Sequence, residues 1–314
     1  MNSNKINRLA EKLVSNLKSV LFHLIYYFLE VPWAAYNLYI QKRSLKNLGI
    51  RYPIINSIRF NNVNFLIYFA SKGIIEEIIL KEGSYEGNLL TLADCFIGEK
   101  TIIIDVGANI GFESLYFAKK YPGNLVFSYE PASFAHQCLS RSKEINRCEN
   151  LKIFKMGVGD KGGQMQINAP THNSYNKGLA AIDNNFDLDD TFVKETIAIV
   201  TLDEHIKENQ RVSFIKIDVQ GYEQNVLRGA LDLIGKDRPV IIFEHYDSYH
   251  SQPLEERKKI ESLFSSMNYE FYLIRAGRFM RPHHFLEKIA LGTTKEIHGD
   301  IVAIPMHSSG EGIP

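Results

Sequence analysis

An apolar run that ends in a carboxylate leads into a glycine-rich turn at residues 101–111, TIIIDVGANIG. Asp105 ends the run, and Gly107 and Gly111 lie in the turn before the helically spaced segment FESLYFAKKY. Glycines let a backbone approach a ligand and adopt positive φ, and the N-terminus of a following helix offers free N–H groups to an anion. The segment is predicted to be a buried strand feeding a nucleotide-binding loop.

The residue types in this loop limit the ligand. A dinucleotide fingerprint would have glycine in place of Asn109, and a carboxylate at Asp105 would repel a pyrophosphate. A carboxylate suits a cationic ligand, such as the aminoacyl end of S-adenosylmethionine. A nicotinamide-dependent oxidoreductase is the weaker alternative.

Two further acidic residues have spacings typical of nucleoside binding. Glu130 follows the apolar segment LVFSY, roughly twenty residues beyond the glycine loop, where a carboxylate accepts both ribose hydroxyls. The alternative is an ordinary solvated glutamate. Asp160, in the turn MGVGDKGG, is a candidate for the adenine amino group, although a plain polar turn would have the same composition.

Candidate catalytic residues follow two later apolar runs. Asp218 ends FIKID, and Glu223 lies in the first turn of the next predicted helix, where a carboxylate also favours the helix dipole. Glu244 and His245 end the run PVIIFEH. His245 is the first candidate for a general base, followed by Glu244 and Asp218, while a structural histidine is the alternative. No metal site is expected, because no third clustered ligand accompanies Asp218 and Glu244.

The order of elements predicts an α/β fold. Strands alternate with helices from residue 101 onward, which implies right-handed crossovers and a parallel sheet with helices on both faces. A hairpin that turns at Asn61-Asn62 is predicted over 56–68, and the polar stretch 169–190 is expected to be a substrate loop. The predicted strands are 101–105, 124–129, 151–155, 212–218, 239–244, 269–274 and 300–305.

Over residues 74 to 275 the chain resembles the FkbM family of S-adenosylmethionine-dependent methyltransferases. The resemblance rests on ordered blocks that include EGSYEGNLL, TIIIDVGANIGFES, SYEPASFAHQCL, GVGDKGG, FIKIDVQGYEQNVLRGA and PVIIFEHY. It implies a Rossmann-like, seven-stranded class I methyltransferase sheet, with an N-terminal helical extension preceding it here. It also implies O-methylation of a sugar, glycan or glycolipid, as in polysaccharide biosynthesis. The alternatives are O-methylation of a small natural product and a non-catalytic cofactor-binding protein at a membrane surface.

The resemblance assigns roles to individual positions. The aminoacyl end of S-adenosylmethionine would be held by the loop, the ribose by Glu130 and the adenine by Asp160. Asp218, Gly221 and Glu223 fall on the family block Asp-Val-Glu-Gly-x-Glu, whose middle Glu is Gln220 here. The loop residues are Asp105, Gly107, Asn109 and Gly111.

Composition sets the broader limits. The 314 residues carry a formal net charge of zero, which gives no indication of nucleic-acid binding. Three cysteines without metal spacing argue against a disulfide framework and favour a reducing cytoplasm. We expect three regions: an amphipathic helical extension over 1–55, a hairpin and helical lead-in over 56–98, and the methyltransferase domain over 99–306.

The N-terminal segment has two interpretations. Leucines recur at three- and four-residue steps from Leu9 to Leu24, with basic residues beside them and Trp33 and Tyr36 beyond. This stripe can pack on the protein's own core or on a second subunit of a homo-oligomer, or lie on the inner face of the membrane.

We expect residues 1–40 to mediate weak, salt-sensitive binding to anionic vesicles. Flotation with and without these residues, at low and high salt, measures the attachment. A full-length protein that stays unbound at low salt, with a truncation that aggregates or changes its oligomeric state, would show that the segment is a packing element.

Overall fold

The computed structural model describes residues 52–176, 181–182, 191–207, 209–275 and 285–306. These residues belong to one structural unit, which begins at Tyr52. The amphipathic stripe predicted near the N-terminus lies outside the described residues, so both of its interpretations remain predictions. Within the described ranges, no helix has the length and apolar character needed to cross a bilayer.

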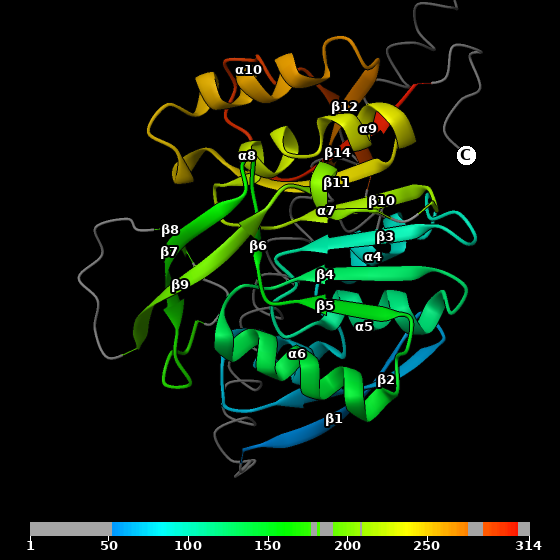
Figure 1. The fold of residues 1–314 in the computed structure, drawn as a ribbon, viewed down its shortest axis with the longest axis vertical. Coiled ribbons are helices and arrows are strands. Elements are labelled where there is room, and N and C mark those ends of the chain that lie inside the picture. Colours follow the sequence, from blue (N-terminus) through cyan, green and yellow to red (C-terminus); the bar gives the residue numbers. More distant parts are fainter. Residues whose placement is uncertain (1–51, 177–180, 183–190, 208, 276–284, 307–314) are drawn as a thin grey trace, which may run out of the picture. The chain divides into compact units, whose positions relative to one another are not determined.

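An eight-stranded mixed sheet forms the centre of the fold (Figure 1). Its order is β13-β12-β14-β11-β10-β3-β4-β5, and the last five strands are mutually parallel. Strand β14 pairs antiparallel with both β11 and β12. The strands are β3 (Ile102–Val106), β4 (Leu125–Tyr129), β5 (Leu151–Phe154), β10 (Val212–Ile217), β11 (Val240–Tyr246), β12 (Tyr269–Arg275), β13 (Phe285–Ile289) and β14 (His298–Pro305).

The α/β class and the Rossmann-like sheet are confirmed, whereas the predicted count of seven strands is wrong by one. The additional strand, β13, pairs antiparallel with β12 at the edge of the sheet. It contains the exposed charged residues Glu287 and Lys288 and has only one neighbouring strand. A short edge strand of this kind lacks the continuous apolar run that marks a buried one.

Helices cover both faces of the sheet, and each strand contributes to two cores. Ile103 packs with Leu115 and Leu139 on the face that carries α5 and α6. The next residue, Ile104, packs with Ile234 on the other face, which carries α8, α9 and α10. This alternation follows from the two-residue period of a strand. The helices are α5 (Phe112–Lys120), α6 (Ser133–Asn146), α8 (Glu223–Arg228), α9 (Leu231–Asp237) and α10 (Pro253–Phe264).

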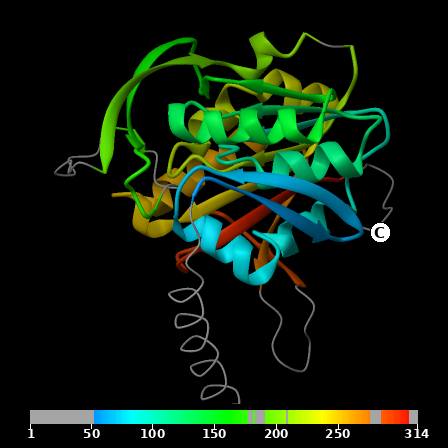
Figure 2. The same ribbon diagram turned by 90° about the horizontal axis from the view of Figure 1, so that it is seen from below.

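The predicted hairpin is confirmed as β1 (Ile54–Phe60) and β2 (Val63–Phe69), which turn through Asn61 and Asn62 at positive φ. Figures 1 and 2 show it in blue on the side of the sheet that carries α5 and α6. Side chains of α6 provide hydrogen-bond partners for the backbone at the free edge of β2. For example, the Leu66 N–H donates to Asn146 Oδ1 at 2.8 Å. Helices α3 (Ile74–Glu82) and α4 (Gly87–Ala93) connect the hairpin to β3.

A second, four-stranded sheet stands beside the carboxyl edge of the central one, in the order β6-β9-β7-β8. The sequence analysis missed β7 and β9, although Met165 and Ile167 alternate with polar residues as a half-buried strand should. The predicted substrate loop begins at the end of β7, and its residues 177–180 and 183–190 lie outside the described part. The strands are β6 (Gly157–Val158), β7 (Gly163–Pro170), β8 (Ala181–Ile182) and β9 (Phe192–Val200), and α7 (Leu202–His205) follows them.

Replacing Asn146 with alanine should destabilise the packing of the hairpin on α6. Asn146 also donates to the backbone oxygens of Leu66 and Ser142, at 2.5 and 2.7 Å, and the substitution removes these two bonds together with the one from the Leu66 N–H. We expect Asn146→Ala to lower the free energy of unfolding by about 1–3 kcal/mol, measured by urea denaturation. Asn173→Ala, at an exposed site, is the control, and equal stability of the two variants would contradict this role.

Candidate active site

Two close contacts hold the loop that follows β3. Gly107 has φ +84°, and a Cβ there would lie 1.8 Å from the backbone oxygen of Asp218. Gly111 has φ +90°, and its Cβ would lie 2.1 Å from Leu139 Cδ1 of α6. Neither position admits a side chain. Glycine is therefore required by contact with a neighbouring strand end and helix, a cause that the sequence analysis had not considered.

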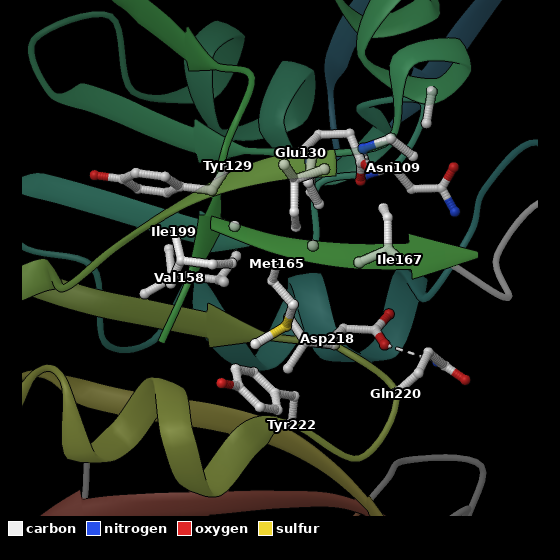
Figure 3. Close-up of a pocket in the computed structure, with 18 residues that line it drawn as sticks. Asn109, Tyr129, Glu130, Val158, Met165, Ile167, Ile199, Asp218, Gln220 and Tyr222 are labelled. Atoms are coloured by element: carbon white, nitrogen blue, oxygen red, sulfur yellow. Dashed lines mark hydrogen bonds between the residues drawn. The ribbon is translucent and has the colours of Figure 1, made fainter. Parts of the chain in front are cut away.

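A pocket with about 780 Å³ of empty volume, here called pocket 1, lies between this loop and the second sheet. Figure 3 shows Asn109 and Glu130 above the strand that carries Met165 and Ile167, and Asp218 below it. An apolar slot with a few convergent polar groups is typical of a site for a flat aromatic ligand with a polar tail. The apolar lining includes Val158, Met165, Ile167, Ile197 and Ile199, and Tyr129 and Tyr222 also line the pocket.

Glu130 lines pocket 1 and is only 5% exposed. Its Oε2 accepts the Asn109 N–H and its Oε1 accepts the Ala132 N–H, both at 2.8 Å. Burial raises the pKa of Glu130 to about 7. Each oxygen keeps a second lone pair, so the carboxylate can accept two further hydrogen bonds, as the ribose assignment requires.

Asn109 has left-handed backbone geometry with φ +49°, and its side chain offers an unused acceptor. Its Oδ1 is buried and has no hydrogen-bond partner in the protein, although the residue lines pocket 1. A buried acceptor without a partner is costly, and a ligand N–H or O–H group would satisfy it.

Asp105 lies beneath the loop and is absent from the lining of either pocket described here. It is fully buried, and its Oδ2 accepts the Ser114 hydroxyl at 2.5 Å. Burial raises the pKa of Asp105, and the nearby Lys216 opposes that shift. The structure thus places Asp105 below the predicted cofactor site.

A second pocket, pocket 2, with about 450 Å³ of empty volume, lies on the other side of the glycine loop. It is lined by that loop, by Tyr85 from the segment before α4, and by the charged side chains of Glu113, Lys216 and Glu244. Four residues line both pockets, and we call them the junction. They are Gly107, Asn109, Asp218 and Gln220.

Lys216 is the buried cation of pocket 2, with its side chain 4% exposed. Its Nζ lies 3.5 Å from both Glu86 Oε2 and Asp218 Oδ2. Burial alone would lower the pKa of Lys216, but the carboxylates around it, with Glu86 and Glu113 foremost, raise it well above its usual value. Burial in turn raises the pKa of Glu86 to about 7 and that of Glu113 well above its ordinary range. Pocket 2 is therefore rich in carboxyl groups around one fixed positive charge.

Gln220 joins two of the predicted catalytic carboxylates. Its Nε2 donates to Asp218 Oδ1 at 3.0 Å and to Glu244 Oε2 at 3.1 Å. Burial, followed by the charge of Asp218, raises the pKa of Glu244 to about 9. Asp218 and Glu244 are thus brought together, with Asp218 in the junction and Glu244 in the lining of pocket 2.

His245 lies on the opposite face of β11 from Glu244. It is 1% exposed, and its Nε2 lies 3.0 Å from Asp247 Oδ1, which Arg257 Nε also approaches at 3.2 Å. Its ring stacks on His250 with centroids 5.0 Å apart, and burial lowers the pKa of His245. Neither pocket lining includes it. The structural-histidine interpretation accounts for these contacts, so a catalytic role for His245 remains a prediction without geometric support.

Glu223 closes the turn before α8. Its Oε1 accepts the Gly221 N–H at 3.0 Å and the Val219 N–H at 3.4 Å. The side chain is 2% exposed, and burial raises its pKa to about 7. These contacts fit the alternative interpretation, in which Glu223 stabilises the N-terminus of the helix. Glu223 belongs to neither pocket lining.

Asp160 points to a helix rather than into pocket 1. Its Oδ2 accepts a hydrogen bond from Arg228 Nη1 of α8 at 2.9 Å. The residues just before it, Gly157 and Val158, do line the pocket. The turn is held close to α8, since a Cβ on Gly229 would lie 1.9 Å from the backbone oxygen of Gly159.

Sequence reasoning missed several residues of the two pockets. Lys216 interrupts the otherwise apolar run FIKI, and a lone charge in a buried strand is a signal for a paired ionic site. Glu113 and Tyr85 carried no such signal, because only the fold brings them to Lys216. Among the described residues, no group of three or more His, Cys, Asp and Glu side chains is arranged to hold a metal ion.

Two curated proteins similar to this chain are methyltransferases. Methyltransferase 1 of Beauveria bassiana is 25% identical over 149 residues, which is 43% of this chain and 60% of that protein, less than two thirds of its length. Methyltransferase sdnD of Sordaria araneosa is 25% identical over 194 residues, covering 52% of this chain and 73% of that protein.

Among solved structures, the methyltransferase FkbM from Methylobacillus flagellatus is 18% identical with a TM-score of 0.40, over 65% of this chain and 43% of that one. The M. jannaschii protein TYW2, solved in complex with AdoMet, is 13% identical with a TM-score of 0.36, over 81% of this chain and 87% of that one.

Residues 105–271, more than half of the chain, match the family described as the methyltransferase FkbM domain. The matched segment begins at Asp105, at the end of β3, and ends at Phe271 in β12, so it contains the junction. The chain therefore belongs to the FkbM family of methyltransferases.

Proposed function

We propose that this methyltransferase uses S-adenosylmethionine to methylate a hydroxyl group of a sugar, glycan or glycolipid. The observation that supports this most directly is the junction. A transfer between two bound molecules requires two adjoining sites, and Gly107, Asn109, Asp218 and Gln220 line both pockets. Pocket 1 would hold the cofactor, and pocket 2 the acceptor.

Pocket 1 fits the nucleoside part of the cofactor. The apolar wall formed by β6, β7 and β9 suits an adenine ring, and the Glu130 carboxylate, held by two backbone N–H groups, suits a ribose. The unpaired Asn109 Oδ1 offers an acceptor to a ligand donor. Bound there, S-adenosylmethionine supplies a methyl group on a good leaving group.

The charges of pocket 2 favour a neutral, hydroxyl-rich acceptor over an acidic one. Glu113 is 3% exposed, and its Oε1 has no hydrogen-bond partner, so a hydroxyl donor would satisfy it. A carboxylate or phosphate on the acceptor would meet the charges of Asp218 and Glu244 and be repelled. A sugar, which carries several hydroxyl donors, matches these features.

Asp218 is the best-placed general base. It lies at the junction, and its Oδ2 lies near Lys216 while its Oδ1 accepts from Gln220. Glu244, whose pKa is about 9, holds a proton near neutral pH in the absence of a cofactor, and the positive charge of a bound sulfonium would favour its ionised form. The protein thus orients the hydroxyl and removes its proton, and orientation supplies most of the effect.

Glu130→Gln should weaken cofactor binding without unfolding the protein. An amide has one acceptor oxygen, so it cannot serve two backbone donors and two hydroxyls. We expect affinity for S-adenosylhomocysteine, measured by calorimetry, to fall by about 1–3 kcal/mol. In the wild type, this affinity should rise over roughly pH 6–8, because a group with a pKa of about 7 must ionise to accept both hydroxyls.

The control for this measurement is Glu144→Gln, at an exposed site on α6. It should leave both the affinity and its pH dependence unchanged. An affinity for S-adenosylhomocysteine that is the same in Glu130→Gln and the wild type would refute the ribose assignment.

Asp218→Asn should lower turnover by roughly 10²–10⁴-fold, the usual contribution of a general base. Turnover can be followed with radiolabelled S-adenosylmethionine on an acceptor found by screening neutral mono- and oligosaccharides. His245→Ala should act on stability, because it removes the buried contact between His245 Nε2 and Asp247 Oδ1 and leaves a cavity in its place. If a folded His245→Ala variant has lost turnover while Asp218→Asn remains active, His245 and not Asp218 is the general base.

A further inference from the structure

Gln220 occupies an unusual position for a residue with a side chain. Its φ of +54° lies in the left-handed region, which disfavours residues other than glycine. Residues held in such a conformation persist only where their surroundings fix them, and they cluster at functional sites. In this case the carboxamide points to Asp218 at the junction, and Figure 3 marks the hydrogen bond between them.

The carboxamide satisfies two carboxyl groups with one nitrogen. Nε2 carries two hydrogens, one for Asp218 Oδ1 and one for Glu244 Oε2. Two carboxylates this close would otherwise share a proton, because like charges at short range cannot both ionise. Hydrogen bonds to the ionised form of each carboxyl group favour that form. The glutamine therefore permits both groups to be ionised when a cation lies beside them.

We propose that Gln220 is a positioning residue that holds the Asp218 and Glu244 carboxylates at the junction, so that the site binds a cationic sulfonium more tightly than a neutral thioether. This inference rests on the proposed function, in which S-adenosylmethionine is the substrate and S-adenosylhomocysteine the product. The two ligands differ by the methyl group and its positive charge. Loss of that charge on transfer would then weaken product binding and promote release.

The amide is better suited to this role than the carboxyl group found at this position of the family block. A protonated carboxyl group has one O–H donor and can satisfy only one of the two neighbours. An ionised one has no donor and adds a third negative charge. Gln220→Glu and Gln220→Met therefore both remove the double hydrogen bond. Gln220→Glu introduces an ionisable carboxyl group in its place, whereas Gln220→Met introduces a neutral side chain.

The test compares the affinities of S-adenosylmethionine and S-adenosylhomocysteine by calorimetry in the wild type, Gln220→Met and Gln220→Glu at pH 7.5. We expect the preference for S-adenosylmethionine to fall about tenfold in Gln220→Met, the scale of a lost hydrogen bond to a charged group. In Gln220→Glu, it should fall less than in Gln220→Met, because the added carboxylate attracts the sulfonium and offsets part of the loss. Gln166→Met, exposed on β7, is the matched control and should leave both affinities unchanged.

The ratio of the two affinities separates positioning from a general structural effect, which would weaken both ligands alike. A ratio within twofold of the wild type in both folded Gln220 variants would overturn the inference. If Gln220→Met does not fold, Glu244→Gln provides the test, because it removes one of the two carboxylate charges. The inference fails if Glu244→Gln does not lower the ratio of the two affinities. A wild-type protein that binds neither ligand would instead refute the proposed function.

Discussion

The ammonium group of Lys216 holds together the carboxyl edge of the central sheet. Carboxylates from three separate segments surround it, namely Glu86 before α4, Glu113 of α5 and Asp218 after β10. So many charges could not leave water without a counter-charge, and removal of one partner from a buried ionic group is strongly destabilising. The segment before α4, the glycine loop and the turn after β10 thus share one electrostatic anchor. Pocket 2 is built around this anchor, and Asp218 links the anchor to the lining of pocket 1.

The two-residue period of the strands decides which side chains can meet this anchor. Glu244 lies on the same face of the sheet as Lys216 of the neighbouring strand β10, whereas His245 lies on the face covered by α10. The same alternation places Asp105 beside Lys216 in the strand register and sends its neighbours into the opposite core. Adjacent residues of β11 therefore have separate environments. Glu244 lines pocket 2, whereas His245 is enclosed beside the ion pair of Asp247 and Arg257.

Sequence patterns predicted the parts of the fold that local rules determine. The buried strands, the glycine loop and the Asn61-Asn62 turn each depend on residues close in sequence, and Glu130 was placed by its distance from the loop. The faces of His245 and Glu223 could not be assigned, because they depend on which helices pack against which side of the sheet. The apolar wall of pocket 1 was missed for a related reason, since β7 and β9 pair across a long connection.

The close approach of Gly229 to Gly159 links regions that would otherwise move separately. A Cβ at Gly229 would overlap the backbone oxygen of Gly159, so the end of α8 and the turn after β6 lie in direct backbone contact. Helix α8 starts at the turn that carries Gln220, and the turn after β6 adjoins Val158 in the wall of pocket 1. Helix α8 and its contact with Gly159 therefore join the turn that carries Gln220 to the wall of pocket 1.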